Sequence, residues 1–144
     1  MDDIDKQIVN LLTLNGRTSN AELARKTGLS APSVAERIRR LEDIGVVAGF
    51  SLKVEPKALG FPLAAYIRIR PMPGNHQKIA ALMTTLDPVV ECHRVTGEDC
   101  FIATAHLRSI EELEAVIDEI IPFATTNTSI LQSTPVPRRT RLLA

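Results

Sequence analysis

Hydrophobic side chains recur at the spacing of α-helices over the first sixty residues. Apolar residues return every three or four positions in three successive runs, and each run is bounded by a capping residue or a glycine. The second run stops at Gly28 and the third starts after Ser30, which is the spacing of a helix-turn-helix. We therefore expect helices from Asp2 to about Leu14, from Ser19 to Gly28 and from Ser30 to near Gly45.

The hydrophobic period changes beyond the third helix. The segment from Val46 to Val54 favours a strand, because β-branched and aromatic residues are frequent there, and Pro56 stops it. Strand and helix patterns then follow in the order β-α-β-β-α-β, which is typical of a ferredoxin-like sandwich with two helices on one face of an antiparallel sheet. The expected strands cover 63–70, 89–96, 100–105 and 126–131, and the expected helices lie around 79–86 and 109–120.

These patterns divide the chain of 144 residues into two domains of the α+β class. We place the first domain at residues 1–60 and the second at residues 61–144, with the boundary in the turn-rich segment between Pro56 and Gly60. The sheet face without helices needs a second subunit or water, and the Ile, Leu and Val of the strands favour a second subunit. Small domains also gain stability by associating.

The formal net charge is zero, with 17 basic and 17 acidic residues, but the two signs are segregated. Residues 17–41 contain six basic and two acidic side chains, whereas residues 61–137 contain five basic and nine acidic ones. Local charge attracts a polyanion, so the helix-turn-helix region is suited to DNA despite the neutral sum. The tail with Arg138, Arg139 and Arg141 is expected to contact DNA or a neighbouring subunit, or to be disordered.

Composition also indicates the cellular compartment. No apolar run approaches the roughly 20 residues that cross a bilayer, and the chain opens with acidic residues, so we expect a cytoplasmic protein without a membrane partner. Cys92 and Cys100 are too few for a disulfide framework. We interpret both as reduced thiols in strands.

The outward face of the third helix carries the sharpest DNA candidates. Val34, Ile38 and Leu41 form its buried stripe, so Arg37 and Arg40 are expected to point outward. Arginine donates paired hydrogen bonds to guanine or contacts phosphate, and glutamate accepts from cytosine. The alternative is a solvated charged face, as on most surface helices. The candidate DNA-contacting residues are Arg17, Ser30, Ser33, Glu36, Arg37, Arg39 and Arg40.

Other chemistry has weaker support in the sequence. Cys92, His93, Cys100 and His106 invite a metal site, but adjacent residues of a strand such as Cys92 and His93 point to opposite faces. A thiol enzyme lacks an evident oxyanion loop or orienting partner, so no catalytic residue and no cofactor is expected. RNA-recognition modules share the β-α-β-β-α-β order, but they stack bases on aromatic residues, and this chain has four Phe and one Tyr.

Several stretches together resemble the Lrp/AsnC (feast/famine) family of regulators. They are residues 2–5 (DDID), 16–24 (GRTSNAELA), 28–30 (GLS), 37–42 (RIRRLE) and 45–47 (GVV), and residues 91–99 (ECHRVTGED), which resemble the family's effector-domain signature. The resemblance covers nearly the whole chain, from Asp2 to about Leu131. It implies a winged helix-turn-helix, a linking strand that helps dimerisation, and a ferredoxin-like domain that assembles dimers into octamers. It also implies that an amino acid or a related small molecule binds between subunits.

The loop after the second strand of the ferredoxin-like domain is the candidate effector site. In the sequence Thr96-Gly97-Glu98-Asp99, a carboxylate is suited to hold the α-ammonium of an amino acid while backbone N–H groups bind its carboxylate. Thr126 and Thr128 lie two apart on one strand face and are expected to add hydroxyl contacts. The alternatives are an ordinary hairpin turn and threonines that simply favour a strand. Many family members carry Asp where Cys100 stands here, which leaves the identity of the effector open.

The sequence therefore predicts a sequence-specific, double-stranded DNA-binding transcription regulator whose assembly or DNA affinity responds to a small molecule. Two other classes stay open, namely RNA binding and a small-molecule-binding or catalytic domain whose helix-turn-helix mediates only protein contacts. The expected partners are double-stranded DNA, an amino-acid effector and further copies of the chain, as homodimers that assemble into an octamer.

Overall fold

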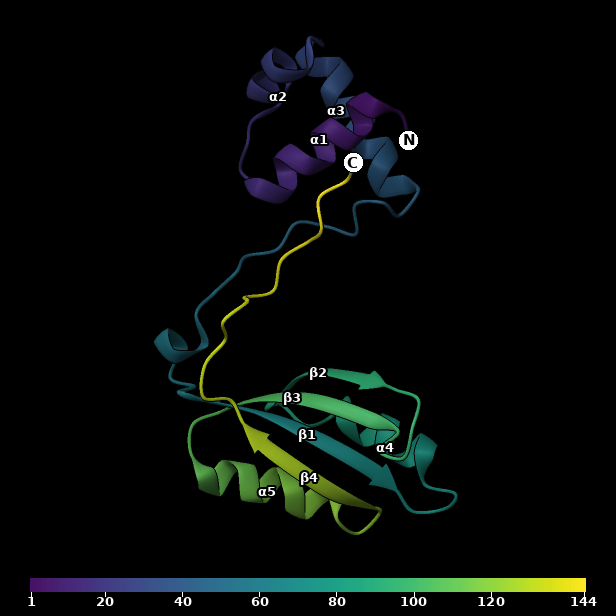
Figure 1. Ribbon diagram of the computed structural model, residues 1–144, viewed down its shortest axis with the longest axis vertical. Coiled ribbons are helices and arrows are strands. Elements are labelled where there is room, and N and C mark those ends of the chain that lie inside the picture. The colour runs from purple at the N-terminus through teal and green to yellow at the C-terminus, as the bar shows by residue number, and fades with distance from the viewer. The chain divides into compact units, whose positions relative to one another are not determined.

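The computed structural model describes all residues from Met1 to Ala144. It divides into two compact units: the first comprises Met1–Lys53 and Val136–Ala144, and the second comprises Val54–Pro135 (Figure 1). The C-terminal tail therefore belongs to the same unit as the first three helices. No helix has both the length and the apolar composition that crossing a bilayer requires.

Three helices form the first unit, as the sequence predicts. They are α1 (Asp3–Leu14), α2 (Asn20–Thr27) and α3 (Ala31–Asp43). Ser19 and Ser30 cap α2 and α3, because each hydroxyl accepts a hydrogen bond from the backbone N–H three residues later, at 3.2 and 3.3 Å. Gly28 ends α2 with a φ of +74°, a left-handed conformation that permits the tight turn into α3. The helix-turn-helix is confirmed.

The core of the first unit is small and contains a charged group. Ile8 of α1, Leu23 of α2, and Val34 and Leu41 of α3 are fully buried. Asp5 of α1 is fully buried as well, and it is the one charged residue of the chain in that position. Because an unpaired buried carboxylate is strongly unfavourable, Asp5 needs cationic or hydrogen-bonding partners inside this unit.

The segment after α3 is not a strand, contrary to the expectation for Val46 to Val54. It has no regular secondary structure, and no β-wing follows the helix-turn-helix. A strand requires a neighbour that takes up its backbone N–H and C=O groups, and a single chain supplies none at this point. Phe50 and Leu52 are left 55% and 87% exposed. The segment leads into the short 3-10 turn η1 (Pro56–Leu59), which begins at the proline.

The second unit is a four-stranded antiparallel sheet with two helices. Its strands lie in the order β2-β3-β1-β4 (Figure 1). This arrangement is the ferredoxin-like sandwich that the sequence predicts. In chain order the elements are β1 (Leu63–Pro71), α4 (His76–Met83), β2 (Val89–Arg94), β3 (Phe101–Leu107), α5 (Ile110–Ile120) and β4 (Ala124–Ile130).

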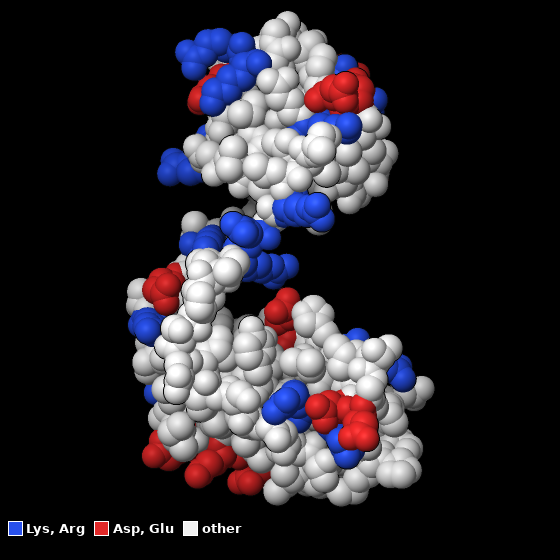
Figure 2. Space-filling model, in the orientation of Figure 1, with Lys and Arg blue, Asp and Glu red and all other residues white.

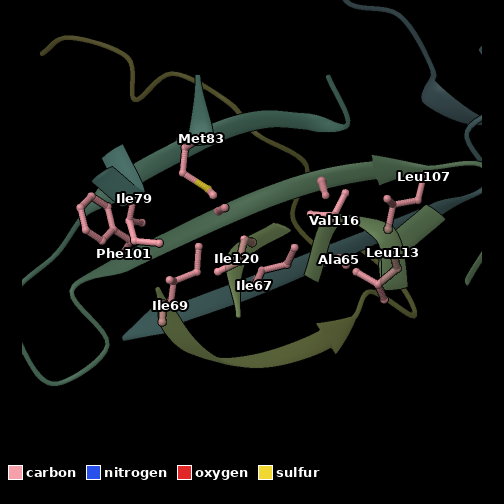
Figure 3. Packing of buried hydrophobic residues seen from close by; sticks show 13 residues of the cluster. Ala65, Ile67, Ile69, Ile79, Met83, Phe101, Leu107, Leu113, Val116 and Ile120 are labelled. Atoms are coloured by element: carbon pink, nitrogen blue, oxygen red, sulfur yellow. The ribbon is translucent and has the colours of Figure 1, made fainter. Parts of the chain in front are cut away.

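Alternation along the strands sends one set of side chains into a core between the sheet and its two helices (Figure 3). Every second residue of β3, and of β1 from Ala65 onward, is buried, and the apolar ones belong to one cluster with residues of α4 and α5. The buried cluster comprises Ala65, Ile67, Ile69, Phe101, Ala103, Ala105, Leu107 and Ala124 from the strands, and Ile79, Met83, Leu113, Val116 and Ile120 from the helices.

The opposite face of the sheet is mixed and largely polar, so the strands support a second subunit less strongly than their composition predicts. The register places Tyr66 opposite Thr104 and Arg68 opposite Ile102 on this face. Arg68 also donates a 2.8 Å hydrogen bond to the side chain of Asn127 on β4. Most of the Ile, Leu and Val side chains of the strands point into the core instead, because successive residues alternate between faces.

Candidate functional site

The N-terminus of α3 presents the first group of predicted DNA contacts. Ser30 is the N-cap, and its hydroxyl lies 2.8 Å from that of Ser33, one turn along the helix. In a helix-turn-helix the first residues of the second helix reach base edges, and its free backbone N–H groups favour phosphate. This end of α3 is suited to both kinds of contact.

The exposed side of α3 continues with Glu36 and Arg39. Both side chains are exposed and neither forms an ion pair. Arg17 is also exposed, in the turn between α1 and α2, where the side chain of Asn15 holds its backbone N–H at 3.0 Å. Arg25 in the last turn of α2 is exposed and unpaired too. Sequence reasoning missed Arg25, although a basic residue at the end of the first helix of a helix-turn-helix is a usable signal.

Arg37 and Arg40 both form ion pairs with aspartates, so neither is free as the outward position predicted, although Arg40 is exposed. Arg37 Nη1 donates to Asp2 Oδ2 and to Asp5 Oδ1, each at 2.7 Å. Arg40 Nη2 donates to Asp5 Oδ2 at 2.5 Å. The side chain of Asp5 is fully buried, whereas those of Arg37 and Arg40 are 26% and 54% exposed. The hydrophobic stripe of α3 gives no sign of these partners, because they belong to α1.

A capping box at the start of α1 arranges the two carboxylates. The side chain of Asp2 accepts from the backbone N–H of Asp5 at 2.8 Å, and the side chain of Asp5 accepts from that of Asp2 at 3.0 Å. Two aspartates three residues apart at a helix start were the available sequence signal. We call Asp2, Asp5, Arg37 and Arg40 the aspartate–arginine cluster.

The cluster is held in its charged form. The hydrogen bond from Arg37 lowers the pKa of Asp2, and the backbone N–H of Asp5 acts in the same direction. Burial acts to raise the pKa of Asp5, but hydrogen bonds from the Asp2 backbone and from Arg37, with the charge of Arg40, outweigh it and lower this pKa. Hydrogen bonds to Asp2 and Asp5 raise the pKa of Arg37. The cluster therefore fixes α1 to α3. It also means that Arg37 and Arg40, two of the expected DNA contacts, already have partners within the protein.

Charge distinguishes the two units. The first contains eleven basic and seven acidic residues, and the second contains six basic and ten acidic residues. In Figure 2 acidic side chains gather along the lower border of the second unit, where Figure 1 places α5. That helix carries Glu111, Glu112, Glu114, Asp118 and Glu119. A polyanion is therefore attracted to the first unit and repelled by the second.

The predicted effector loop is a tight hairpin between β2 and β3. The N–H of Val95 donates to the carbonyl of Cys100 at 2.7 Å and closes the turn. Gly97 has a φ of +105°, a conformation that side chains rarely permit. Cys100 has a φ of +58°, and its Sγ lies 3.8 and 3.7 Å from the carbonyl oxygens of Gly97 and Glu98. These contacts join residues of the loop to one another.

The two carboxylates of the loop have an internal cation. Arg70 Nη2 lies 2.7 Å from Glu98 Oε2 and 3.6 Å from Asp99 Oδ1. An ammonium group at this loop would therefore share these carboxylates with Arg70. Sequence reasoning missed Arg70, although the alternation of β1 places it on the polar face of the strand.

Thr126 and Thr128 lie on the helix-covered face of β4, opposite Ile69 and Ile67 of β1. The hydroxyl of Thr128 is buried without a hydrogen-bond partner. In the order β2-β3-β1-β4, β3 and β1 separate β4 from the edge strand that leads into the loop. One chain therefore does not bring these threonines together with residues 96–99.

Cys92 and His93 point to opposite faces of β2, as adjacent residues of a strand should. Cys92 pairs with buried Ala103 and packs against the core, and burial raises the pKa of its thiol. His93 Nε2 lies 3.2 Å from Glu91 Oε1. No three His, Cys, Asp or Glu side chains gather as ligands for a metal ion.

Both units match known domain families. Residues 1–42 match the family model described as the AsnC-type helix-turn-helix domain, and residues 64–141 match that of the Lrp/AsnC ligand binding domain. The two matches together span most of the chain, in the order that the sequence predicts.

Relatives of similar length share both domains with this chain. It is 32% identical to the HTH-type transcriptional regulator LrpC of Bacillus subtilis over 133 residues. This alignment covers 92% of each protein. It is 35% identical over 129 residues to the HTH-type transcriptional regulator LrpA of Mycobacterium tuberculosis, covering 89% of this chain and 86% of that protein. These relatives are named as transcriptional regulators and not as enzymes, in agreement with the sequence.

Solved structures of such proteins have the same fold. The structure of Bacillus subtilis LrpC has a TM-score of 0.88 at 31% identity, covering 96% of this chain and 99% of that one. The feast or famine regulatory protein of Mycobacterium tuberculosis, complexed with L-methionine, has a TM-score of 0.92 at 32% identity and covers 99% of each chain.

Proposed function

Because this chain belongs to the Lrp/AsnC family of transcription regulators, we propose that it places α3 in the major groove of double-stranded DNA. The observation that carries the proposal is the exposed side of α3, which follows the turn at Gly28 and presents polar and charged groups without internal partners. The basic excess of the first unit supports the same assignment.

The proposed contacts divide by chemistry. Glu36 and Arg39 are charged and unpaired, so they are suited to base edges. Ser30, Ser33 and Arg17 are suited to phosphate, which fixes the register of the protein on the duplex. Arg40 is half exposed and has further N–H donors to offer while it binds Asp5. Arg37 acts mainly by orienting α3.

Substitution of Glu36 and Arg39 tests this assignment. We expect Arg39→Ala and Glu36→Ala each to weaken operator binding by about 5- to 150-fold, the equivalent of ~1–3 kcal/mol for a lost base contact. The operator would first be identified by mapping bound DNA across the genome. Arg94→Ala is the matched control, because it removes one charge from the second unit. Unchanged operator affinity in both α3 variants would assign DNA contact to another surface.

The second unit binds an amino acid at the loop of residues 96–99 in this proposal. Glu98 and Asp99 supply carboxylates for an ammonium group, and the backbone of Thr96 and Gly97 supplies N–H donors for a carboxylate. The Mycobacterium tuberculosis relative complexed with L-methionine supports an amino acid as the ligand. Thr126 and Thr128 are two strands away in the same chain, so a neighbouring copy would have to supply them.

A thermal-shift screen of the amino acids tests the ligand site. We expect Asp99→Ala to weaken binding of the identified amino acid by about tenfold, since one charge-assisted contact is lost. Basal DNA affinity should stay at the wild-type value. Equal ligand affinity in the variant would show that the loop is only a turn.

The proposed assembly is a homodimer that forms an octamer. The linking segment supports it, because Phe50, Leu52 and Val54 are exposed and its backbone has no strand partner within the chain. We expect Phe50→Asp/Leu52→Asp to reduce the assembly in sedimentation velocity. A wild-type chain that sediments as a monomer at micromolar concentration would contradict the proposal. The cytoplasmic location, expected from the lack of a long apolar run and from the acidic start of the chain, stays a prediction.

A further inference from the structure

The C-terminal tail is anchored on the first helix of the DNA-binding unit. The side-chain amide of Asn10 donates to the carbonyl of Leu143, and its oxygen accepts from the N–H of Leu143, both at 2.9 Å. Leu143 and Ala144 also line a shallow groove together with Leu11 and Leu14 of α1. Both polar atoms of one side chain thus hold the backbone of one residue, as a neighbouring strand would. We call Val136–Ala144 the C-terminal arm.

The arm supplies most of the net positive charge of its unit. Residues 1–53 contain eight basic and seven acidic side chains, a net charge of +1, and Arg37 and Arg40 are engaged by Asp2 and Asp5. The arm contains three arginines and no acidic residue, which raises the net charge of the unit to +4. Most of the positive excess that would attract a polyanion therefore lies on the arm.

We propose that the C-terminal arm is a second DNA-binding element, which contacts phosphates through Arg138, Arg139 and Arg141 while Asn10 holds its end on α1. Arginine stays protonated and donates paired hydrogen bonds to phosphate. The arm contributes affinity for any duplex sequence, in addition to base contacts by α3. This inference rests on the proposed function, since it presupposes that the protein binds duplex DNA.

Salt dependence of DNA binding tests the arm in the full-length protein. The variant Arg138→Gln/Arg139→Gln/Arg141→Gln is compared with wild type on the operator and on a random-sequence duplex. We expect the slope of log K against log salt to fall by about 0.9 for each lost phosphate contact, up to about 2.7, on both duplexes. The control Lys57→Gln/Arg94→Gln/Arg108→Gln removes the same charge from the second unit and should keep the wild-type slope.

A second variant tests the anchor. Asn10→Ala keeps every charge but removes both hydrogen bonds to Leu143, so we expect severalfold weaker binding of both duplexes. Wild-type affinity in this variant would overturn the role of Asn10 as a positioning residue.

The remaining outcomes separate the inference from the proposed function. A wild-type salt slope in the triple arginine variant, or an equal fall of the slope in the control variant, would overturn the inference. Neither outcome would affect the proposed DNA contacts of α3. Loss of self-association without a change of slope would assign the arm to a neighbouring copy and overturn the inference as well. A wild-type protein that binds neither duplex would instead remove the proposed function itself.

Discussion

The two units build their cores from different chemistry. In the first unit a fully buried carboxylate, that of Asp5, lies among a few buried aliphatic residues and is satisfied by two arginines. In the second unit the buried cluster of sheet and helices is apolar throughout (Figure 3). A buried apolar cluster depends little on pH or salt, whereas a charged cluster depends on both.

This difference matters because the charged cluster includes two arginines of α3, the helix that we propose reads DNA. Arg37 and Arg40 hold α3 against α1, and Glu36 and Arg39 occupy neighbouring positions on the exposed side. Residues that position the helix and residues proposed to read DNA thus alternate along one element. A loss of DNA binding on substitution in α3 has to be compared with the stability of the first unit before a contact is assigned.

The largest effect should come from the apolar core. Ile67→Ala removes a fully buried side chain from the centre of β1 and should lower the free energy of unfolding of the second unit by about 2–5 kcal/mol. Hydrogen exchange should show lower protection in the second unit and wild-type protection in the first. Tyr66→Ala on the open face is the control, with a much smaller loss. Equal losses of protection in both units would mean that they do not unfold separately.

Breaking the aspartate–arginine cluster should destabilise the first unit. Asp5→Ala leaves Arg37 and Arg40 without their buried partner and should lower the thermal midpoint of the first unit by about 10 °C. Asp3→Ala is the control, because that carboxylate is exposed and pairs only with Lys6. Calorimetry that shows equal midpoints for the two variants would contradict the stabilising role of the cluster.

Acid should increase the difference in stability between the two units. The pKa values of Asp2 and Asp5 are lowered in the folded protein, so their contribution to stability is present above roughly pH 4 and is lost as the pH falls through the folded-state values. The first unit should therefore lose stability as the pH falls below about 4, and the Asp5→Ala variant should show a flatter profile. Circular dichroism during acid titration measures both, and a parallel profile in the variant would refute the assignment.

The smallest effect on stability should come from the loop. Arg70→Ala removes a surface ion pair and should lower the stability of the second unit by less than about 1 kcal/mol. Because Arg70 would no longer compete with the ammonium group of the amino acid for Glu98 and Asp99, the amino acid should bind a few times more tightly. Titration calorimetry measures that affinity, with Arg68→Ala as the control. Weaker binding in the Arg70 variant would mean that Arg70 contacts the ligand.

The fold was predictable where its signals are local. The serine caps, the turn at Gly28 and the alternation from Leu63 onward each depend on a few neighbouring residues, and the elements that they predict are present. The strand expected at 46–54 was wrong, because a strand depends on a partner that no local pattern encodes.

The candidate sites were predictable only in part, for a related reason. Helical spacing identifies which side of α3 is buried, but it says nothing about the aspartates of α1 that engage Arg37 and Arg40. In the same way, strand spacing places Thr126 and Thr128 on one face, but only the sheet order shows that two strands separate β4 from the edge strand β2. Contacts between distant segments were the missing information in both cases.

The chain passes between the two units twice, after Lys53 and again after Pro135. In topological terms the ligand-binding unit is an insertion within the DNA-binding unit and not an appendage at its end. Recombination at a single junction would exchange the C-terminal arm together with the ligand-binding unit and so separate the native arm from Asn10. An exchange that keeps the hydrogen bonds between Asn10 and Leu143 needs two compatible junctions. Point substitution within the second unit, in contrast, leaves both junctions intact.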